Sequence, residues 1–181
     1  MRLRLATPDD IPALQILIPA SVRALQKDYY STLQMDGAIG SVFGVDSQLI
    51  HDRTYFVVEA PNGEGKTVMA GCGGWSKRKT LYGSDSVQGK DNAWLDPVAD
   101  AARIRAFFVH PDWPRRGVGS RILEACESAA RAAGFTRLEM AATLPGVPLY
   151  KARGYVEVEP FDVPLSNGEK LPVIKMTKLI G

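Results

Sequence analysis

The segment Arg115–Ser120 has the residue types needed to hold a phosphate group. It reads Arg-Arg-Gly-Val-Gly-Ser and lies between an apolar stretch, Arg103–Val109, and an amphipathic stretch that ends at Gly134. Glycines let the backbone approach a ligand because they carry no Cβ. The first amides of a helix have no intrahelical partner and lie at the positive end of its dipole. The pattern therefore predicts a strand, a turn and a helix N-terminus that binds an anion, with Arg115 and Arg116 adding positive charge.

Two common phosphate-binding motifs do not match this segment. A Walker loop needs Lys followed by Ser or Thr after its last glycine, but Ser120 and Arg121 follow Gly119 here. A Rossmann fingerprint needs a third glycine where this chain has Ile122. A Gly-x-Gly pair before a helix also occurs as an ordinary structural turn, so both interpretations stay open on these residues alone.

A family resemblance favours the ligand-binding interpretation. The segment Arg103–Gly134 resembles the acetyl-CoA-binding core of the GNAT superfamily of N-acetyltransferases, whose signature is Gln/Arg-x-x-Gly-x-Gly/Ala. In this chain the signature runs from Pro114 to Gly119, with Pro in place of the usual Gln or Arg. That departure removes one polar contact and one backbone donor. The amides between Arg116 and Ser120, which the resemblance assigns to pyrophosphate, do not depend on it.

A second segment, Leu149–Tyr155, resembles another motif of the same family, an aromatic residue that begins a short helix ending in Gly and a second aromatic residue. In that family the tyrosine at the position of Tyr150 often protonates the departing CoA thiolate. The resemblance therefore implies Tyr150 as the catalytic acid, and a phenol with a reference pKa of about 10 can act in this way. Taken alone, Tyr150 would be interpreted as an aromatic residue of the core.

The resemblance also implies acetyl-CoA as the cofactor. Helix amides would hold the pyrophosphate, the pantetheine arm would follow the strand edge, and a backbone N–H near Val109 would polarise the thioester carbonyl. In the family a bulge in this strand leaves such groups free, and we expect the same bulge here. The expected cofactor-binding residues are Phe107, Phe108, Val109, Arg115, Arg116, Gly117, Val118, Gly119, Ser120, Lys151 and Arg153.

The sequence does not single out the base that removes the amine proton. Glu59, His51 and Asp28 are candidates, and His110 lies in a His-Pro-Asp turn after the apolar strand. For each of them a structural or solvent-facing role is the competing interpretation. A relay of ordered water with no single base is a further alternative.

The acceptor amine would meet the cofactor near residues 23–50 and 76–101, as the resemblance implies. Both segments contain aromatic and acidic residues, which together suit a cationic amine. The candidates are Asp28, Tyr29, Tyr30, Phe43, Tyr82, Asp85, Asp91, Trp94 and Asp96. For Trp75 and Trp94, core packing or loop anchoring is the competing interpretation.

The predicted function is therefore acetyl transfer from acetyl-CoA to a primary amine of a small molecule or peptide, by direct attack in a ternary complex. A non-catalytic acyl-CoA-binding or sensing domain is the alternative. An interaction module, in which the glycines only form a turn, is a third interpretation. A homodimer formed through the C-terminal strands is left open.

Composition limits the other classes. The 181 residues are 45% hydrophobic and 23% charged with a net charge of +2, as expected for one globular domain spanning 1–181. The longest basic run is Lys77–Lys79, which indicates no nucleic-acid groove. No apolar run approaches the ~20 residues of a membrane span, and the N-terminus alternates like a strand rather than a signal peptide. Cytoplasm is the expected location. Cys72 and Cys126 predict neither disulfides nor a metal site.

The periodicity predicts a mixed α/β fold, and the GNAT resemblance implies a central, mostly antiparallel sheet flanked by helices. The first helix follows Thr7, and Pro19 is expected to kink or end it. A short helix capped by Asp46 is expected within 45–52, and the rest of 29–52 has no regular pattern. Residues 79–101 are expected to form a long loop. The expected strands are 2–6, 53–60, 66–75, 103–109, 137–142, 155–159 and 173–179, with a long helix up to Ala133.

Overall fold

A computed structural model describes residues 1–181, and the chain forms one seven-stranded sheet. The strand order is β1-β2-β3-β4-β5-β7-β6, and all neighbouring strands are antiparallel except β4 and β5. This confirms the predicted mixed, mostly antiparallel sheet. The strands are β1 (Arg2–Leu5), β2 (Tyr55–Pro61), β3 (Thr67–Ser76), β4 (Ala102–Val109), β5 (Arg137–Thr143), β6 (Val156–Pro164) and β7 (Lys170–Leu179).

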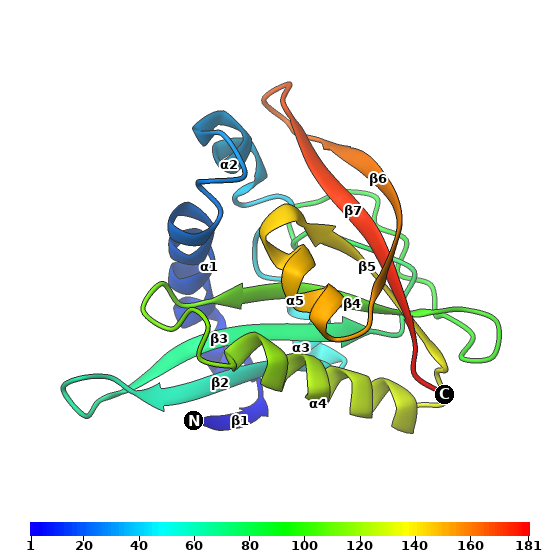
Figure 1. Ribbon diagram of the computed structural model, residues 1–181, viewed down its shortest axis with the longest axis horizontal. Helices are drawn as coiled ribbons and strands as arrows, with labels where there is room; N and C mark the ends of the chain where they lie inside the picture. Colours follow the sequence, from blue (N-terminus) through cyan, green and yellow to red (C-terminus); the bar gives the residue numbers. More distant parts are fainter.

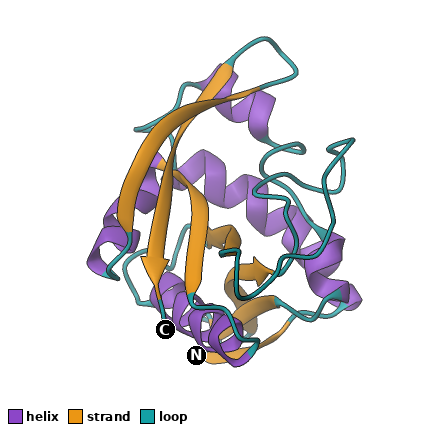
Figure 2. Cartoon of the chain, turned by 90° about the vertical axis from the view of Figure 1, so that its right-hand side faces the viewer, coloured by secondary structure: helices purple, strands orange, loops and turns teal.

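Helices lie on both sides of this curved sheet (Figures 1 and 2). None of them is both long and apolar enough to cross a membrane. The helices are α1 (Ile11–Leu25), α2 (Thr32–Ala38), α3 (Ser47–His51), α4 (Val118–Ala132) and α5 (Val147–Ala152), with two short 3₁₀ turns, η1 (Pro8–Asp10) and η2 (Leu144–Gly146).

The helix does not end at Pro19, one of the two expected effects of this proline, because α1 continues to Leu25. A proline inside a helix removes one hydrogen bond and crowds the preceding turn. In α1, however, Leu14, Ile18 and Val22 are fully buried on both sides of the proline. Their packing against the sheet holds the helix together through the defect.

The segment between α1 and β2 is more regular than its sequence pattern indicated. The helix α2 begins at a capping box. The Ser31 hydroxyl accepts from the Gln34 backbone amide at 3.1 Å, and the Gln34 side-chain carbonyl accepts from the Ser31 amide at 2.9 Å. This Ser-x-x-Gln spacing is a sequence signal for a helix start. The cap predicted at Asp46 is confirmed, because its carboxylate accepts from the Gln48 amide at the start of α3.

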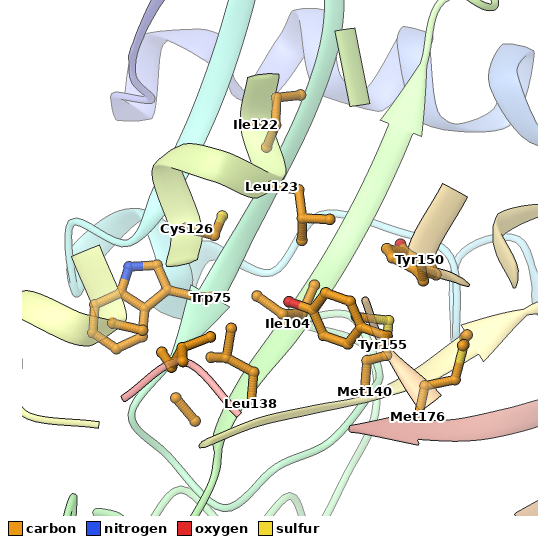
Figure 3. Close-up of a cluster of buried hydrophobic side chains, with 14 of the residues drawn as sticks. Trp75, Ile104, Ile122, Leu123, Cys126, Leu138, Met140, Tyr150, Tyr155 and Met176 are labelled. Atoms are coloured by element: carbon orange, nitrogen blue, oxygen red, sulfur yellow. The ribbon is translucent and has the colours of Figure 1, made fainter. Parts of the chain in front are cut away.

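Two hydrophobic clusters fill the two sides of the sheet. Strand β2 shows the alternation behind this arrangement, since Val58 packs in the cluster below α4 while Val57 packs in the cluster below α1. Figure 3 shows the first cluster, in which Ile122 and Cys126 of α4 approach the sheet. Both Cys126 and Cys72 are fully buried free thiols, which fits the expected core position of Cys126.

The last two strands extend beyond their predicted limits. Strand β6 runs on from Glu159 to Pro164, and β7 begins at Lys170 rather than at Val173. The prolines in these segments argued against strands, because proline is rare in strands except at sheet edges. The strand β6 is an edge strand, where proline is tolerated. The turn predicted at 166–168 joins the two strands, with Gly168 at a φ of +86°.

Candidate functional site

The site begins where the two parallel strands separate. Strands β4 and β5 share only two register pairs, Ala102 with Leu138 and Arg103 with Glu139. Beyond these pairs the strands diverge toward their C-terminal ends (Figure 1). A pocket lined by β4, β5, β6, β7, α5 and the connections before β4 lies at this opening. Its volume is about 70 Å³, where a single water needs roughly 10–15 Å³, so it suits a small group.

A bulge in β4 shapes this opening, as expected. Between Cys72 and Gly74 of β3 the register shifts, and Ala106 opposite has a φ of +56°. The Tyr55 hydroxyl donates to the Ala106 carbonyl at 2.8 Å and so holds the bulge. Because one residue is inserted, Phe107 packs against the cluster below α4 while Ala106 faces the other side.

The Val109 amide has a partner within the chain. The next amide, that of His110, donates to the Ala70 carbonyl of β3 at 2.9 Å. The Val109 N–H therefore points away from β3, and there it donates to the Ser21 hydroxyl of α1 at 3.2 Å. The expected role of a backbone N–H near Val109 toward a thioester carbonyl stays a prediction.

The start of α4 has the free amides that the sequence predicted. No side chain caps this helix, and its first turn contains no acidic residue. The first intrahelical bond runs from the Arg121 amide to the Gly117 carbonyl at 3.0 Å. The amides of residues 118–120 therefore lack acceptors within the helix. Gly117 itself has a φ of +78°, a conformation that side chains other than glycine rarely adopt.

The surroundings of these amides are basic and open. Arg115 and Arg116 are exposed, and the Arg116 guanidinium lies 5.0 Å from the centre of the Trp113 ring. The Val118 side chain is buried in the core, so only its backbone faces the loop. Gly119 serves close packing, because a Cβ there would lie 3.0 Å from Leu149 Cδ2 of α5. The loop thus offers amides and arginines to an anion.

Tyr150 connects α5 with the pocket. Its side chain is 7% exposed and lines the cavity. Its ring meets those of Phe107 and Tyr155 edge to face, with centroid distances of 6.2 and 5.9 Å. Figure 3 shows both tyrosines on the side of the cluster away from Trp75. Burial raises the pKa of Tyr150 well above its usual value, so the phenol keeps its proton at neutral pH.

Comparison with known families identifies this arrangement. The profile of the acetyltransferase (GNAT) domain matches residues 51–157, more than half of the chain. The chain belongs to the GNAT acetyltransferase family. No curated protein matches its sequence at a significant level.

Solved GNAT structures share the fold over the whole chain. One, described as a GCN5-related N-acetyltransferase and class-II aminotransferase from Rhodopseudomonas palustris, is 25% identical with a TM-score of 0.69 and covers 98% of this chain and 94% of its own. A putative acetyltransferase from Salmonella typhimurium with acetyl-CoA is 16% identical, with a TM-score of 0.62 and coverage of 100% and 94%. An N-acetyltransferase from Thermoplasma acidophilum in complex with coenzyme A is 10% identical, with a TM-score of 0.61 and coverage of 98% and 98%.

Two residues assigned to the cofactor from the GNAT resemblance already have partners within the chain. Lys151 pairs with Glu157 at 2.7 Å, and Arg153 pairs with Glu124 at 2.6 Å. These side chains lie at the surface, where ion pairs contribute little stability and exchange readily. Their role toward a GNAT cofactor stays a prediction.

The candidate bases of the GNAT reaction do not lie in the pocket. Glu59 accepts from Arg4 Nε at 2.8 Å on β2, and His51 Nδ1 lies 2.8 Å from the Ser47 carbonyl on α3. Asp28 is exposed after α1, and none of the three lines the cavity. The sequence could not distinguish them because it does not show which residues the sheet opening brings together.

The acids expected to bind a cationic amine are also outside the pocket. Asp85 accepts from the Ser47 amide at 2.9 Å, Asp91 from the Ala93 amide at 3.0 Å, and Asp96 from the Val98 amide at 2.9 Å. They organise turns, which is the common role of Asp in loops. No carboxylate side chain lines this pocket.

The aromatic candidates divide between the pocket and the framework. Phe43 and Tyr82 line the cavity, whereas Tyr29 is exposed. Trp75 is buried in the core. Trp94 is exposed and anchors its loop, with the Arg78 guanidinium 3.8 Å from its ring centre.

Three polar residues that sequence reasoning missed line the pocket: Gln26 at the end of α1, Arg105 in β4 and Thr143 in β5. A signal for Arg105 was available, since a charged residue inside an apolar strand must find a special environment. For Gln26 the sequence offered none.

Proposed function

We propose that this protein is an acetyl-CoA-dependent N-acetyltransferase that acetylates a primary amine by direct attack within a ternary complex. The observation that carries the proposal is the conjunction of an uncapped, basic helix N-terminus at α4 with Tyr150 in a pocket at the sheet opening. Relatives of the same fold that hold coenzyme A or acetyl-CoA support it.

The grip on the cofactor would come from the loop before α4. The amides of Gly117, Val118, Gly119 and Ser120 would donate to the pyrophosphate, and Arg115 and Arg116 would add charge. The pantetheine arm would run along β4 beside Phe107 and Phe108. This leads the thioester to the opening between β4 and β5.

The transfer step would use Tyr150 as a proton donor. The amine nitrogen attacks the thioester carbonyl carbon, an N–C bond forms, and the C–S bond breaks. The thiolate takes a proton from the Tyr150 hydroxyl, while the amine releases one to water. That proton restores the phenol, so the sum is an amide and free coenzyme A. Water is the proposed carrier because no carboxylate or histidine lines the pocket.

Calorimetric titration with acetyl-CoA, followed by an assay of thiol release with a panel of amines, tests this proposal. We expect saturable one-site binding of acetyl-CoA and amine-dependent release of coenzyme A. Binding without release for any amine would favour the acyl-CoA-sensing alternative. The absence of binding at millimolar ligand would refute both and leave Gly117 and Gly119 as residues of a turn.

A further inference from the structure

Two buried polar groups without partners share the acceptor pocket. The side chains of Gln26 and Arg105 both line the cavity and are each only 6% exposed. Gln26 Oε1 and Arg105 Nε have no hydrogen-bond partner. A buried polar atom without a partner costs free energy, and such groups in native proteins require an explanation. A ligand that supplies one donor and one acceptor would satisfy both atoms.

Contacts with the protein hold the guanidinium of Arg105 in a fixed position. Its Nη2 donates to the Gly83 carbonyl at 2.7 Å and lies 2.8 Å from Asp46 Oδ2. Asp46 is itself fixed, because its other carboxylate oxygen caps α3 and lies 3.5 Å from Lys90 Nζ. Asp46 does not line the pocket. Both contacts of the guanidinium use Nη2, which leaves Nη1 and Nε without a partner within the chain.

The rest of the lining defines which molecule would fit. Arg105 is the one charged side chain among the lining residues, and most of the others are apolar, including Phe43, Phe108 and Val163. A cationic group would meet no carboxylate there. A carboxylate would meet a preoriented guanidinium, which is a strong and directional partner.

We propose that the acceptor is a small amine with a carboxylate on an apolar frame, an apolar amino acid or a close analogue. Its carboxylate accepts from the Arg105 guanidinium, and one N–H of the same molecule donates to the Gln26 side-chain carbonyl. The apolar frame packs against the walls of the cavity. This inference rests on the proposed acetyltransferase function and adds the substrate class to it.

Pairs of amines that differ only in the carboxylate provide the test. Thiol release from acetyl-CoA is measured with leucine, methionine and phenylalanine, and with isopentylamine, 3-(methylthio)propylamine and 2-phenylethylamine. For the amino acids that react best, we expect kcat/KM to be at least about tenfold higher than for the matched amines without a carboxylate. The reason is that a hydrogen-bonding site discriminates against an analogue that leaves it unpaired.

Variants show whether the two side chains cause this preference. Arg105→Lys keeps a charge beside Asp46 but removes Nε, and Gln26→Met keeps the volume but removes the acceptor. We expect Arg105→Lys to reduce the preference for the carboxylated amine about tenfold, mainly by raising its KM, while the matched amine changes little. Arg78→Lys is the control, since Arg78 also pairs with an aspartate, Asp52 at 2.6 Å, but lies outside the pocket.

The outcomes separate this inference from the proposed function. If acetyl-CoA binds and both series react equally, or if Arg105→Lys slows both series equally, the substrate class is wrong and the acetyltransferase stands. If acetyl-CoA binds but no amine of the panel reacts, the substrate class is tested by the change in melting temperature that N-acetyl-leucine causes in the presence of coenzyme A. A shift that is lost in Arg105→Lys supports the carboxylate subsite, and the absence of a shift refutes it. If acetyl-CoA itself does not bind, the proposed function fails first.

Discussion

At the scale of single residues, Tyr150 is the side chain whose removal should affect chemistry and little else. Replacing Tyr150 by Phe removes the proton donor but keeps the ring contacts with Phe107 and Tyr155. We expect kcat to fall by about 10²-fold or more, because general acid catalysis contributes that much, while the Kd for acetyl-CoA stays within about twofold. Steady-state kinetics and calorimetry measure the two quantities.

Tyr155→Phe is the matched control for this prediction. The Tyr155 hydroxyl is buried without a partner and the residue does not line the pocket. Its removal should leave kcat unchanged. Burial raises the pKa of Tyr150 above its usual value, so wild-type kcat should not decline from loss of this proton between neutral pH and about pH 10. Equal activity of wild type and Tyr150→Phe would exclude the phenol as the acid.

What the sequence predicted at this scale depended on local motifs. Gly117 and Tyr150 lie in short segments whose meaning does not depend on distant parts of the chain. Ser21, Gln26 and Arg105 acquire their roles only through tertiary contacts, such as the 88 residues that separate Ser21 from Val109. No local pattern carries that information, so the expected roles of Val109 and of the loop acids could not be tested before the fold was known.

At the scale of elements, the contact between α4 and α5 links the loop proposed to bind the pyrophosphate to Tyr150, the proposed proton donor. A Cβ at Gly119 would lie 3.0 Å from Leu149 Cδ2, and Leu149 precedes Tyr150 on α5. Gly119→Val should therefore push α5 away and lower both acetyl-CoA affinity and kcat by about tenfold or more, since small misplacements of reacting groups are costly. Calorimetry and kinetics measure the two effects.

Gly63→Val provides the comparison, because nothing lies within 4 Å of a Cβ at Gly63 in its surface turn. That variant should keep both affinity and turnover. If Gly119→Val lowered only the melting temperature and left affinity intact, the glycine would belong to an ordinary turn, and the anion site would lose its support.

The bulge in β4 is a second element with a measurable strain. Ala106 has a φ of +56°, which costs an L residue about 1–2 kcal/mol. Ala106→Gly should relieve this strain and change the free energy of unfolding by at most about 1 kcal/mol in the stabilising direction, reduced by the greater entropy of unfolded glycine. Urea denaturation measures the change.

Tyr55→Phe should act in the opposite direction on the same bulge. It removes the hydroxyl that donates to the Ala106 carbonyl at 2.8 Å, and the buried carbonyl then lacks that partner. We expect a loss of about 1–3 kcal/mol in the same denaturation experiment. If Ala106→Gly destabilised the protein by more than about 1 kcal/mol, positive φ would not be the source of strain at this position.

Elements were predictable where periodicity and caps agreed. The long amphipathic helix α4 and the Asp46 cap of α3 follow directly from spacing. The exceptions are Pro19 inside α1 and the extension of β6, where buried packing or an edge position outweighs local propensity. The helix α2 was also not predicted, although its capping box is a local signal. The bulge in β4 was expected only from the family resemblance, because the pairing register of two strands is a tertiary property.

At the scale of the whole molecule, the sheet opening divides the strands into two groups that need other connections. Strands β1 to β4 join the remaining three only through the short pairing of β4 with β5. Across the opening, Tyr30 from the α1–α2 connection donates to the Pro172 carbonyl of β7 at 2.8 Å and accepts from the Leu144 amide at 2.9 Å. Asn167 of the β6–β7 turn donates to the Leu33 carbonyl at 2.8 Å and adds a second link.

The Tyr30 link makes a prediction about alkaline stability. Burial raises the pKa of Tyr30 to about 12, whereas a tyrosine in the unfolded chain titrates at about 10. Because the folded state favours the neutral phenol, its contribution to the free energy of unfolding is complete below about pH 10. It is lost as the pH rises from about 10 to about 12. Tyr30→Phe should be less stable by about 1–3 kcal/mol at neutral pH, since two partly buried backbone groups lose their partner.

The comparison of pH profiles isolates this residue from other alkaline titrations. Cys72, whose pKa burial raises to about 12, contributes equally to wild type and to Tyr30→Phe. The stability difference between the two proteins should therefore be constant up to about pH 10 and shrink above it. Tyr29→Phe, at the exposed neighbouring position, should follow wild type throughout. A difference that stayed constant to about pH 12 would show that the neutral phenol of Tyr30 does not link the two halves of the sheet.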